Sequence, residues 1–242
     1  MAEENYEWTV LDQNTGDYEL SFKMIIIGDS GVGKSCLSLR GTKNIFEPMY
    51  SPTIGFEFMV FFIKINNQII KMQIWDTCGQ EVYRSLISSF YNNASLALIV
   101  YSIDNEDSFN NLEFWLNELR TKANPNINIF LVGNKCDLED NRKISKELGQ
   151  EFYENNKLNL FMESSAKTGF NAENLFVEAA KLLYSQHLKN KGRFSTSDSF
   201  ANSTPRYSNQ SLPLDDIYEE KNKRKMGAVS FSLFYLLYFI FI

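Results

Sequence analysis

The sequence contains few cysteines, prolines and histidines: its 242 residues include three cysteines, five prolines and one histidine. The cysteines stand at positions 36, 78 and 136. They are odd in number and lack the spacing of metal ligands, which excludes a disulfide framework and a zinc site. A reducing compartment is the natural interpretation of such cysteine usage. We assign no function to the single histidine, His187.

Basic residues are not in excess, because 24 lysines and arginines stand against 30 acidic residues and the net charge is −6. The basic side chains do not cluster outside the extreme C-terminus, so we expect no nucleic-acid partner. The first ten residues, MAEENYEWTV, are acidic and have no apolar core, and we expect no secretory signal. Aromatic residues, by contrast, make up 14% of the chain, which suffices for a sizeable core.

Four regions of the chain differ in composition. Residues 1–21 carry scattered acidic side chains without a sustained period, and we expect a flexible acidic extension. Residues 22–187 are expected to form one folded domain. Residues 188–225 are rich in Ser, Asn and Pro, which predicts a disordered linker. Residues 226–242 form an uninterrupted uncharged, apolar tail.

Within residues 22–187, apolar runs typical of strands alternate with amphipathic runs typical of helices. The sequence predicts strands at 22–28, 58–65, 69–75, 95–101, 127–133 and 160–163. It predicts helices at 34–40, 81–92, 106–121, 143–156 and 171–187. This alternation indicates a three-layer α/β fold, a mostly parallel six-stranded sheet with helices on both faces. Asn66-Asn67 is a hairpin signal, which makes 58–65 the one antiparallel strand.

A glycine-rich stretch, GDSGVGKS at 28–35, follows the first predicted strand and fits the P-loop pattern G-x-x-x-x-G-K-[ST]. Its glycines let backbone N–H groups approach phosphate oxygens, which a Cβ would block. Lys34 adds a charge at the outer phosphates, and the Ser35 hydroxyl is placed to ligate Mg²⁺. The expected nucleotide contacts here are Asp29, Ser30, Gly31, Val32, Gly33, Lys34, Ser35 and Cys36. For Cys36, simple packing inside the following helix is the alternative interpretation.

Four more polar clusters accompany the P-loop. They are Thr53-Ile54-Gly55, DTCGQE at 76–81, NKCD at 134–137 and SSAK at 164–167. Three of them directly follow predicted strands, and ligands of open α/β sheets bind at the carboxyl ends of strands. Five clusters at one edge of a sheet are hard to explain by structural need alone, so we expect a single ligand site.

The motifs GDSGVGKS, TIG, WDTCGQE, NKCD and SAK stand in the order and spacing of the small Ras-like GTPases. Within these, the chain resembles the Rab family most, in TIGFEF at 53–58, KMQIWDT at 71–77, QEVYRSL at 80–86, FYNNASLALIVYS at 90–102 and NLEFWLNELR at 111–120. The resemblance covers about residues 22–187. It implies a P-loop GTPase domain that binds GTP or GDP with Mg²⁺, hydrolyses GTP and regulates vesicle-mediated membrane traffic.

The resemblance assigns recognition of guanine to NKCD at 134–137 and SSAK at 164–167. Asp137 would accept hydrogen bonds from guanine N1–H and the exocyclic amine, and adenine would leave this carboxylate unpaired at a cost. Asn134 would hold the loop and face N7, and the stem of Lys135 would lie along the base. The backbone N–H of Ala166 would meet O6, with Ser165 and Lys167 bracing the loop.

The resemblance assigns hydrolysis and switching to the clusters at 53–55 and 76–81. Asp76 would reach Mg²⁺ beside the hydroxyls of Ser35 and Thr53. Gln80 would orient the attacking water, and the Gly79 N–H would contact the γ-phosphate. Thr53 and Gly79 would thus tie two loops to one phosphate, and loss of that phosphate would release both. No arginine stands where a cis-acting finger is expected, so unaided hydrolysis should be slow.

The expected partners are a guanine nucleotide exchange factor, a GTPase-activating protein (GAP) and effectors that read the two loops, and we expect a monomer. Phe58, Trp75 and Phe90 match the family's surface-lying effector triad, with ordinary sheet core as the alternative. A non-cycling nucleotide-binding scaffold is the alternative function, disfavoured because Gln80 and the metal-ligating residues are all present. NKCD and SAK disfavour a P-loop kinase or ATPase.

The tail departs from the Rab pattern. Rab proteins generally end in prenylated cysteines, and this chain has no cysteine after Cys136. The tail 226–242 would span roughly 25 Å as a helix, slightly short of a ~30 Å hydrocarbon core, and a basic cluster within 221–225 precedes it. It is either an anchor in a thin internal membrane or a gene-model error whose true end carries cysteines. Both interpretations predict a protein, peripheral or tail-anchored, on the cytosolic face of an internal membrane.

Overall fold

The computed structural model describes residues 6–13, 15–48, 53, 55–78 and 90–197. Its centre is a seven-stranded sheet with the strand order β1-β3-β4-β2-β5-β6-β7. The strands are β1 (Trp8–Leu11), β2 (Leu20–Ile27), β3 (Phe56–Ile65), β4 (Gln68–Thr77), β5 (Leu96–Ser102), β6 (Asn128–Asn134) and β7 (Leu160–Glu163). Strand β3 is antiparallel to both of its neighbours, β1 and β4, whereas the pairs from β4 to β7 are all parallel. The predicted α/β class, with one strand reversed, is confirmed.

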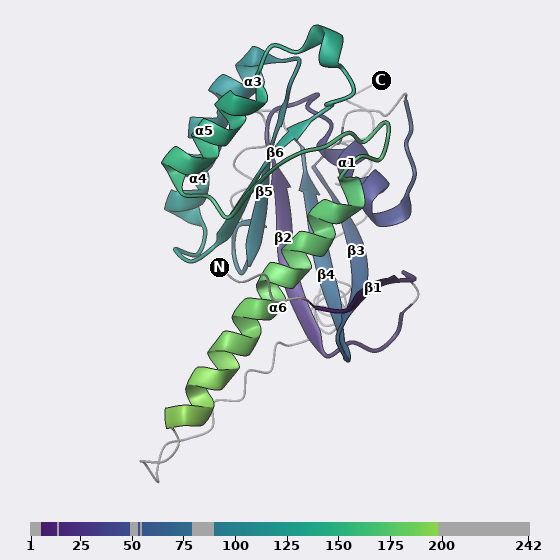
Figure 1. The fold of residues 1–242 in the computed structure, drawn as a ribbon, viewed down its shortest axis with the longest axis vertical. Helices are drawn as coiled ribbons and strands as arrows, with labels where there is room; N and C mark the ends of the chain where they lie inside the picture. The colour runs from purple at the N-terminus through teal and green to yellow at the C-terminus, as the bar shows by residue number, and fades with distance from the viewer. Residues whose placement is uncertain (1–5, 14, 49–52, 54, 79–89, 198–242) are drawn as a thin grey trace, which may run out of the picture. The chain divides into compact units, whose positions relative to one another are not determined.

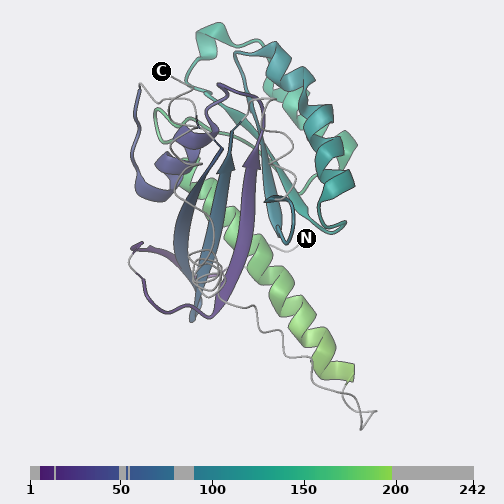
Figure 2. The ribbon, with the colours of Figure 1, turned by 180° about the vertical axis from the view of Figure 1, so that it is seen from behind.

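The helices lie on both faces of the sheet (Figures 1 and 2). They are α1 (Lys34–Lys43), α3 (Glu106–Asn110), α4 (Leu112–Lys122), α5 (Lys146–Asn156) and α6 (Ala172–Ser197), with a 3₁₀ turn at Glu139–Asn141. The alternation of side chains along β2 separates two cores. Met24 and Ile26 pack with residues of α1 and α6, and Ile25 and Ile27 pack with residues of α4. Burial on both faces explains why the central strands read as continuous apolar runs.

Helix boundaries follow local capping chemistry. Helix α1 begins after Gly33, and Asn44 ends it in the left-handed region at φ 56°. The side chain of Asn105 accepts a hydrogen bond from the Ser108 N–H at the start of α3, and Ser145 accepts from the Leu148 N–H at the start of α5. Among the described residues, no helix combines the length and apolarity needed to cross a membrane.

The sequence-based prediction was wrong at the N-terminal end. Residues 8–11, which we expected to belong to a flexible extension, form β1 and pair with Phe62–Ile65 of β3. This strand makes seven strands where six were predicted. The Tyr6 ring packs edge-on against Tyr184 at 5.3 Å between centroids, and Lys181 lies 5.1 Å from the Trp8 ring centroid. Contacts with α6 and the edge of β3 therefore order a segment that has little apolar pattern of its own.

Two other boundaries differ from the prediction. The single helix expected at 106–121 is divided at Asn111 into α3 and α4, and the last helix continues to Ser197, past its predicted end at 187. Most of the helix predicted at 81–92 lies outside the described residues. The remaining predicted elements are present, with ends that differ by a few residues.

The pairing of β1 generates a prediction about stability. Val10 is half-buried against the core, whereas its neighbour Thr9 is exposed on the other face of the strand. Val10→Ala should lower the free energy of unfolding by about 1 kcal/mol, because it removes packed methyl groups. Thr9→Ala should change it by less than about 0.5 kcal/mol. Urea unfolding at fixed ligand concentration measures both, and equal effects would contradict the docking of β1 on this core.

Candidate functional site

The polar clusters meet at one edge of the sheet. The P-loop follows β2, Asp76 and Thr77 end β4, Asn134 ends β6, and Ser164 follows β7. These are carboxyl ends of neighbouring parallel strands, at the upper end of the sheet in Figure 1, where the arrowheads of β2 and β4 point. The convergence of loops predicted from the sequence therefore follows from the parallel topology.

The P-loop has a conformation that requires glycine. Gly28, Gly31 and Gly33 have φ angles of 139°, 78° and 91°, which side-chain-bearing residues rarely adopt. A Cβ at Gly28 would lie 2.2 Å from the carbonyl oxygen of Val100, and one at Gly33 would lie 2.6 Å from Nδ2 of Asn134. The loop is thus a backbone concavity that opens at the N-terminus of α1, a geometry suited to phosphate oxygens.

Lys34 is buried at the base of this loop. Its Nζ donates hydrogen bonds to the carbonyl oxygens of Gly28, at 2.9 Å, and Asp29, at 2.6 Å. Burial lowers the pKa of Lys34 to about 8, and the nearby carboxylates of Asp76 and Asp29 oppose this shift. A bound polyanion would stabilise the ammonium further, so the site favours a ligand with several negative charges.

The carboxylate of Asp76 is fully buried, and neither of its oxygens has a hydrogen-bond partner within the described part of the chain. Desolvation raises the pKa of Asp76 to about 7, opposed by the Ser35 hydroxyl and by Lys34. The hydroxyls of Ser35 and Thr53 lie close together, with 2.6 Å between their oxygens. A buried carboxylate without a hydrogen-bond partner among the described residues, near a hydroxyl that itself contacts a second one, is an oxygen donor set that suits a cation.

These oxygens fit Mg²⁺. Magnesium is usually held by one or two carboxylates, with waters and substrate phosphates completing its octahedron. Among the residues that the structure describes, no three His, Cys, Asp or Glu side chains gather as a self-sufficient metal site. Ser35, Thr53 and Asp76 would therefore hold the ion together with a bound phosphate, as the sequence predicted.

Asn134 connects the opposite side of the site to the P-loop. Its Nδ2 donates to the carbonyl oxygen of Val32 at 2.9 Å, and its Oδ1 accepts from the hydroxyl of Ser164 at 3.3 Å. The side chain is buried. Asn134 therefore holds together two loops that are about a hundred residues apart in sequence, in agreement with the loop-holding role expected of it.

The carboxylate of Asp137 is held by residues of the cluster at 164–167. The Ser165 hydroxyl donates to its Oδ1 at 2.5 Å, and Lys167 Nζ lies 3.8 Å from Oδ2. The N–H of Thr168 in turn donates to Ser165 Oγ at 3.0 Å. Only 11% of the Asp137 side chain is exposed, so an incorrectly matched base would leave a costly unpaired charge. Ala166, whose N–H is expected to meet the base, is buried in the same loop.

Sequence reasoning placed Ser164 in a polar cluster without giving it a role, and it missed Thr168 and Asp104. Ser164 and Thr168 hold Asn134 and the Ser165 loop, and Asp104 lies 3.9 Å from Lys135 Nζ, close enough to direct that side chain. Ser and Thr next to a motif are weak signals, because such residues are common in any loop. Asp104 follows the carboxyl end of β5 and could have been found from its place at the same sheet edge.

Some predicted residues lie elsewhere or are not described. Gly79 and Gln80 lie outside the described residues, so their roles remain predictions. Cys36 is half-buried against the core, and burial raises the pKa of its thiol, in agreement with the packing interpretation. Phe58 is 49% exposed, which argues against the sheet-core alternative for this member of the triad.

The aromatic residues of the triad form one cluster, joined by Phe56. The ring centroids of Trp75 lie 5.1 Å from Phe58, 5.4 Å from Phe90 and 5.3 Å from Phe56. Phe56 itself is 42% exposed. These rings come from β3, β4 and the segment before β5, next to the strand ends that carry Thr53 and Asp76.

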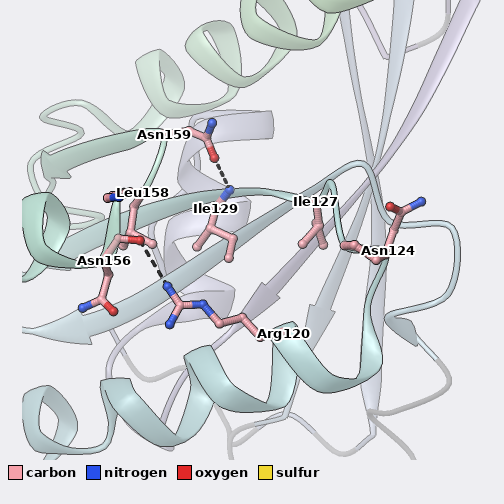
Figure 3. Close-up of a pocket in the computed structure, with 9 residues that line it drawn as sticks. Arg120, Asn124, Ile127, Ile129, Asn156, Leu158 and Asn159 are labelled. Carbon is pink, nitrogen blue, oxygen red and sulfur yellow. Dashed lines mark hydrogen bonds between the residues drawn. The ribbon is translucent and has the colours of Figure 1, made fainter.

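A cavity of about 290 Å³ lies at the other end of β6 and does not belong to this site (Figure 3). Ile127 and Ile129, at the start of β6, line it with Arg120 and Asn159. The Arg120 guanidinium donates to the carbonyl oxygen of Asn156 at 3.1 Å, and Asn159 Oδ1 accepts from the Ile129 N–H at 2.7 Å. These polar groups at the cavity thus hydrogen-bond to other parts of the protein and join neighbouring segments of the chain.

The P-loop geometry generates a matched pair of substitutions. Gly33→Ala should reduce nucleotide affinity by at least about a hundredfold, because the methyl group would both oppose the positive φ and displace Asn134. Gly16→Ala is the control, since a Cβ there meets nothing within 4 Å. Titration of a fluorescent nucleotide measures both, and unchanged binding by folded Gly33→Ala would contradict the role assigned to this contact.

Comparison with protein-family models adds an independent finding. Residues 23–185 match the model of the Ras family. The match spans well over half of the chain and includes the P-loop, the strand ends and the two clusters at 134–137 and 164–167. Members of this family are small GTPases that bind guanine nucleotide, generally with Mg²⁺, hydrolyse GTP and interact with exchange factors, GAPs and effectors. This chain therefore belongs to the Ras family and is a small GTPase.

Proposed function

We propose that this small GTPase is a Rab-like switch, which cycles between GTP and GDP forms to regulate vesicle-mediated membrane traffic. The support for the Rab assignment is in the sequence, in TIGFEF at 53–58, KMQIWDT at 71–77 and NLEFWLNELR at 111–120. The support for cycling is the 2.6 Å contact between the hydroxyls of Thr53 and Ser35, beside the unpaired carboxylate of Asp76. Through this contact, a loop that effectors can read meets the phosphate site.

Each part of the site has a distinct task in the cycle. Lys34 and the backbone N–H groups of the P-loop bind the outer phosphates and hold them in place. Asp137, oriented by Ser165, selects guanine through its two neighbouring N–H donors. Gln80 orients the attacking water. The bound metal would contribute positive charge toward the phosphate oxygens as negative charge develops on them.

Switching follows because the position of Thr53 depends on the γ-phosphate of GTP. Thr53 lies beside Ser35. In the GTP form, Mg²⁺ and the γ-phosphate would bind the hydroxyls of both residues and so keep Thr53 in this position. After hydrolysis and loss of that phosphate, the ligand would no longer hold Thr53 there. We place effector binding in the GTP form on the neighbouring aromatic cluster of Phe56, Phe58, Trp75 and Phe90. Exposed aromatic rings are common anchors of protein interfaces.

Single-turnover hydrolysis tests the switch against a non-cycling scaffold. The purified protein should hydrolyse bound GTP at a rate on the order of 10⁻⁴ s⁻¹ without a GAP and should not retain ATP. Gln80→Leu should slow hydrolysis about tenfold or more, because the water loses its orienting group. Phosphate release is measured with and without a GAP fraction from the same cells. A wild-type protein that binds GTP but releases no phosphate under either condition would support the scaffold.

We also propose that the protein works on the cytosolic face of an internal membrane. The support is the apolar stretch 226–242 and the basic cluster before it, which favours anionic lipid by about 1 kcal/mol per charge. Attachment occurs either by insertion of 226–242 or, if the gene model is wrong at this end, by prenylated cysteines.

Fractionation of the native protein and of a variant lacking 226–242 tests this location. Native protein should sediment with internal membranes, and the truncated variant should move to the soluble fraction. Resistance to carbonate extraction, with a C-terminal peptide ending at Ile242, supports insertion. A prenylated cysteine peptide in the intact-mass analysis supports the lipid instead. A native protein that is entirely soluble in both nucleotide states contradicts the membrane proposal.

A further inference from the structure

The second residue of the P-loop, Asp29, is bound by a helix that the nucleotide site does not otherwise use. The indole N–H of Trp115 donates to its Oδ1 at 2.7 Å, and the Asn111 amide donates to its Oδ2 at 2.6 Å. Both oxygens of the carboxylate therefore have a donor from the α4 region, more than eighty positions along the chain.

The two donors are placed by the break between α3 and α4. Asn111 ends α3 and precedes α4, and its side chain makes no capping hydrogen bond, which leaves the amide free for Asp29. Trp115 lies four residues further on, so both side chains are on the same face of the helix. The Trp115 ring is only 1% exposed within the core beneath α4. The donor at Nε1 is therefore held rigidly.

This contact bears on the phosphate site through Lys34. The backbone carbonyl of Asp29 accepts a hydrogen bond from Lys34 Nζ at 2.6 Å, so the position of Asp29 helps to fix the lysine. The carboxylate of Asp29 is a negative charge in a loop that binds anions. Its two donors hold it toward α4, which limits its repulsion of the phosphates.

The glycine-rich loop has few side chains with which to hold itself in place. Asn134 holds its second half through Val32, and the pair Asn111 and Trp115 holds its first half through Asp29. We propose that Asn111 and Trp115 are positioning residues which fix Asp29 and thereby set the rate at which the P-loop releases its nucleotide. This inference rests on the proposed nucleotide switch and adds a determinant of how long each state lasts.

An exchange of the amide and the carboxylate between Asn111 and Asp29 tests the inference. Asn111→Asp has the same size and the same capping propensity, but it sets a carboxylate against that of Asp29. Release of fluorescent GDP should become at least about tenfold faster, because a charge-assisted hydrogen bond is replaced by repulsion. The double variant Asp29→Asn with Asn111→Asp restores one amide and one carboxylate in exchanged positions. It should release GDP at least about threefold more slowly than Asn111→Asp alone, because the repulsion between the two carboxylates is removed.

Two further variants separate positioning from general damage to the helix. Asn110→Asp adds the same charge at an exposed neighbouring position and should leave the rate within about twofold of the wild type. Trp115→Phe keeps most of the ring but removes the N–H donor, and should speed release about fivefold. A purely structural role of α4 would not predict rescue of Asn111→Asp by a substitution in the P-loop.

The outcomes can be distinguished from failure of the proposed function. If the wild type does not bind guanine nucleotide, the function is wrong. If the wild type binds and Asn111→Asp releases GDP at the wild-type rate, or the double variant is as fast as Asn111→Asp, the positioning role is wrong. Should Asn111→Asp not fold, Asn111→Ala removes the donor without adding charge, and an unchanged release rate in that variant overturns the inference equally.

Discussion

Two charged side chains, Lys34 and Asp76, are buried together at the carboxyl ends of the strands, and among the described residues protein hydrogen bonds offset the desolvation of only the first. Lys34 has backbone carbonyls as partners, whereas Asp76 has no hydrogen-bond partner among the described residues. Burial moves their two pKa values toward each other, to about 8 for Lys34 and about 7 for Asp76. Phosphates would add negative charge beside the lysine, and a cation would give the carboxylate the partner that the described residues do not provide. Ligand binding should therefore stabilise the folded state as well as occupy the site.

The convergence of these polar clusters could be predicted from the sequence because they follow the ends of predictable strands. Each motif is local, and a parallel sheet brings the loops after β2, β4, β6 and β7 to one edge without further information. The glycines, Lys34 and Ser35 could be assigned from the chemistry of phosphate alone. The family resemblance added the roles of Asp137 and Gln80, which the residues by themselves leave ambiguous.

What the sequence did not predict depends on contacts between distant segments. Strand β1 is a four-residue edge strand, half exposed, and its order comes from β3 and from Tyr184 of α6 rather than from its own pattern. The break at Asn111 was missed because the apolar period simply continues through Leu112 into α4. The partners of Asp29 were missed because no local signal pairs a loop carboxylate with a tryptophan over eighty positions away.

The P-loop is thus supported from two sides by side chains that lie outside it. Asn134 belongs to the same loop region as Asp137, and its amide holds the Val32 carbonyl. Asp137, to which we assign guanine recognition, follows three residues later, so one short segment carries both the support of the P-loop and the proposed base contact. On the other side, Trp115 and Asn111 hold the loop whether or not a base is present. The first support joins the P-loop to the carboxyl end of β6, and the second joins it to the start of α4, so both halves of a loop with few side chains of its own are held by buried or helix-borne groups.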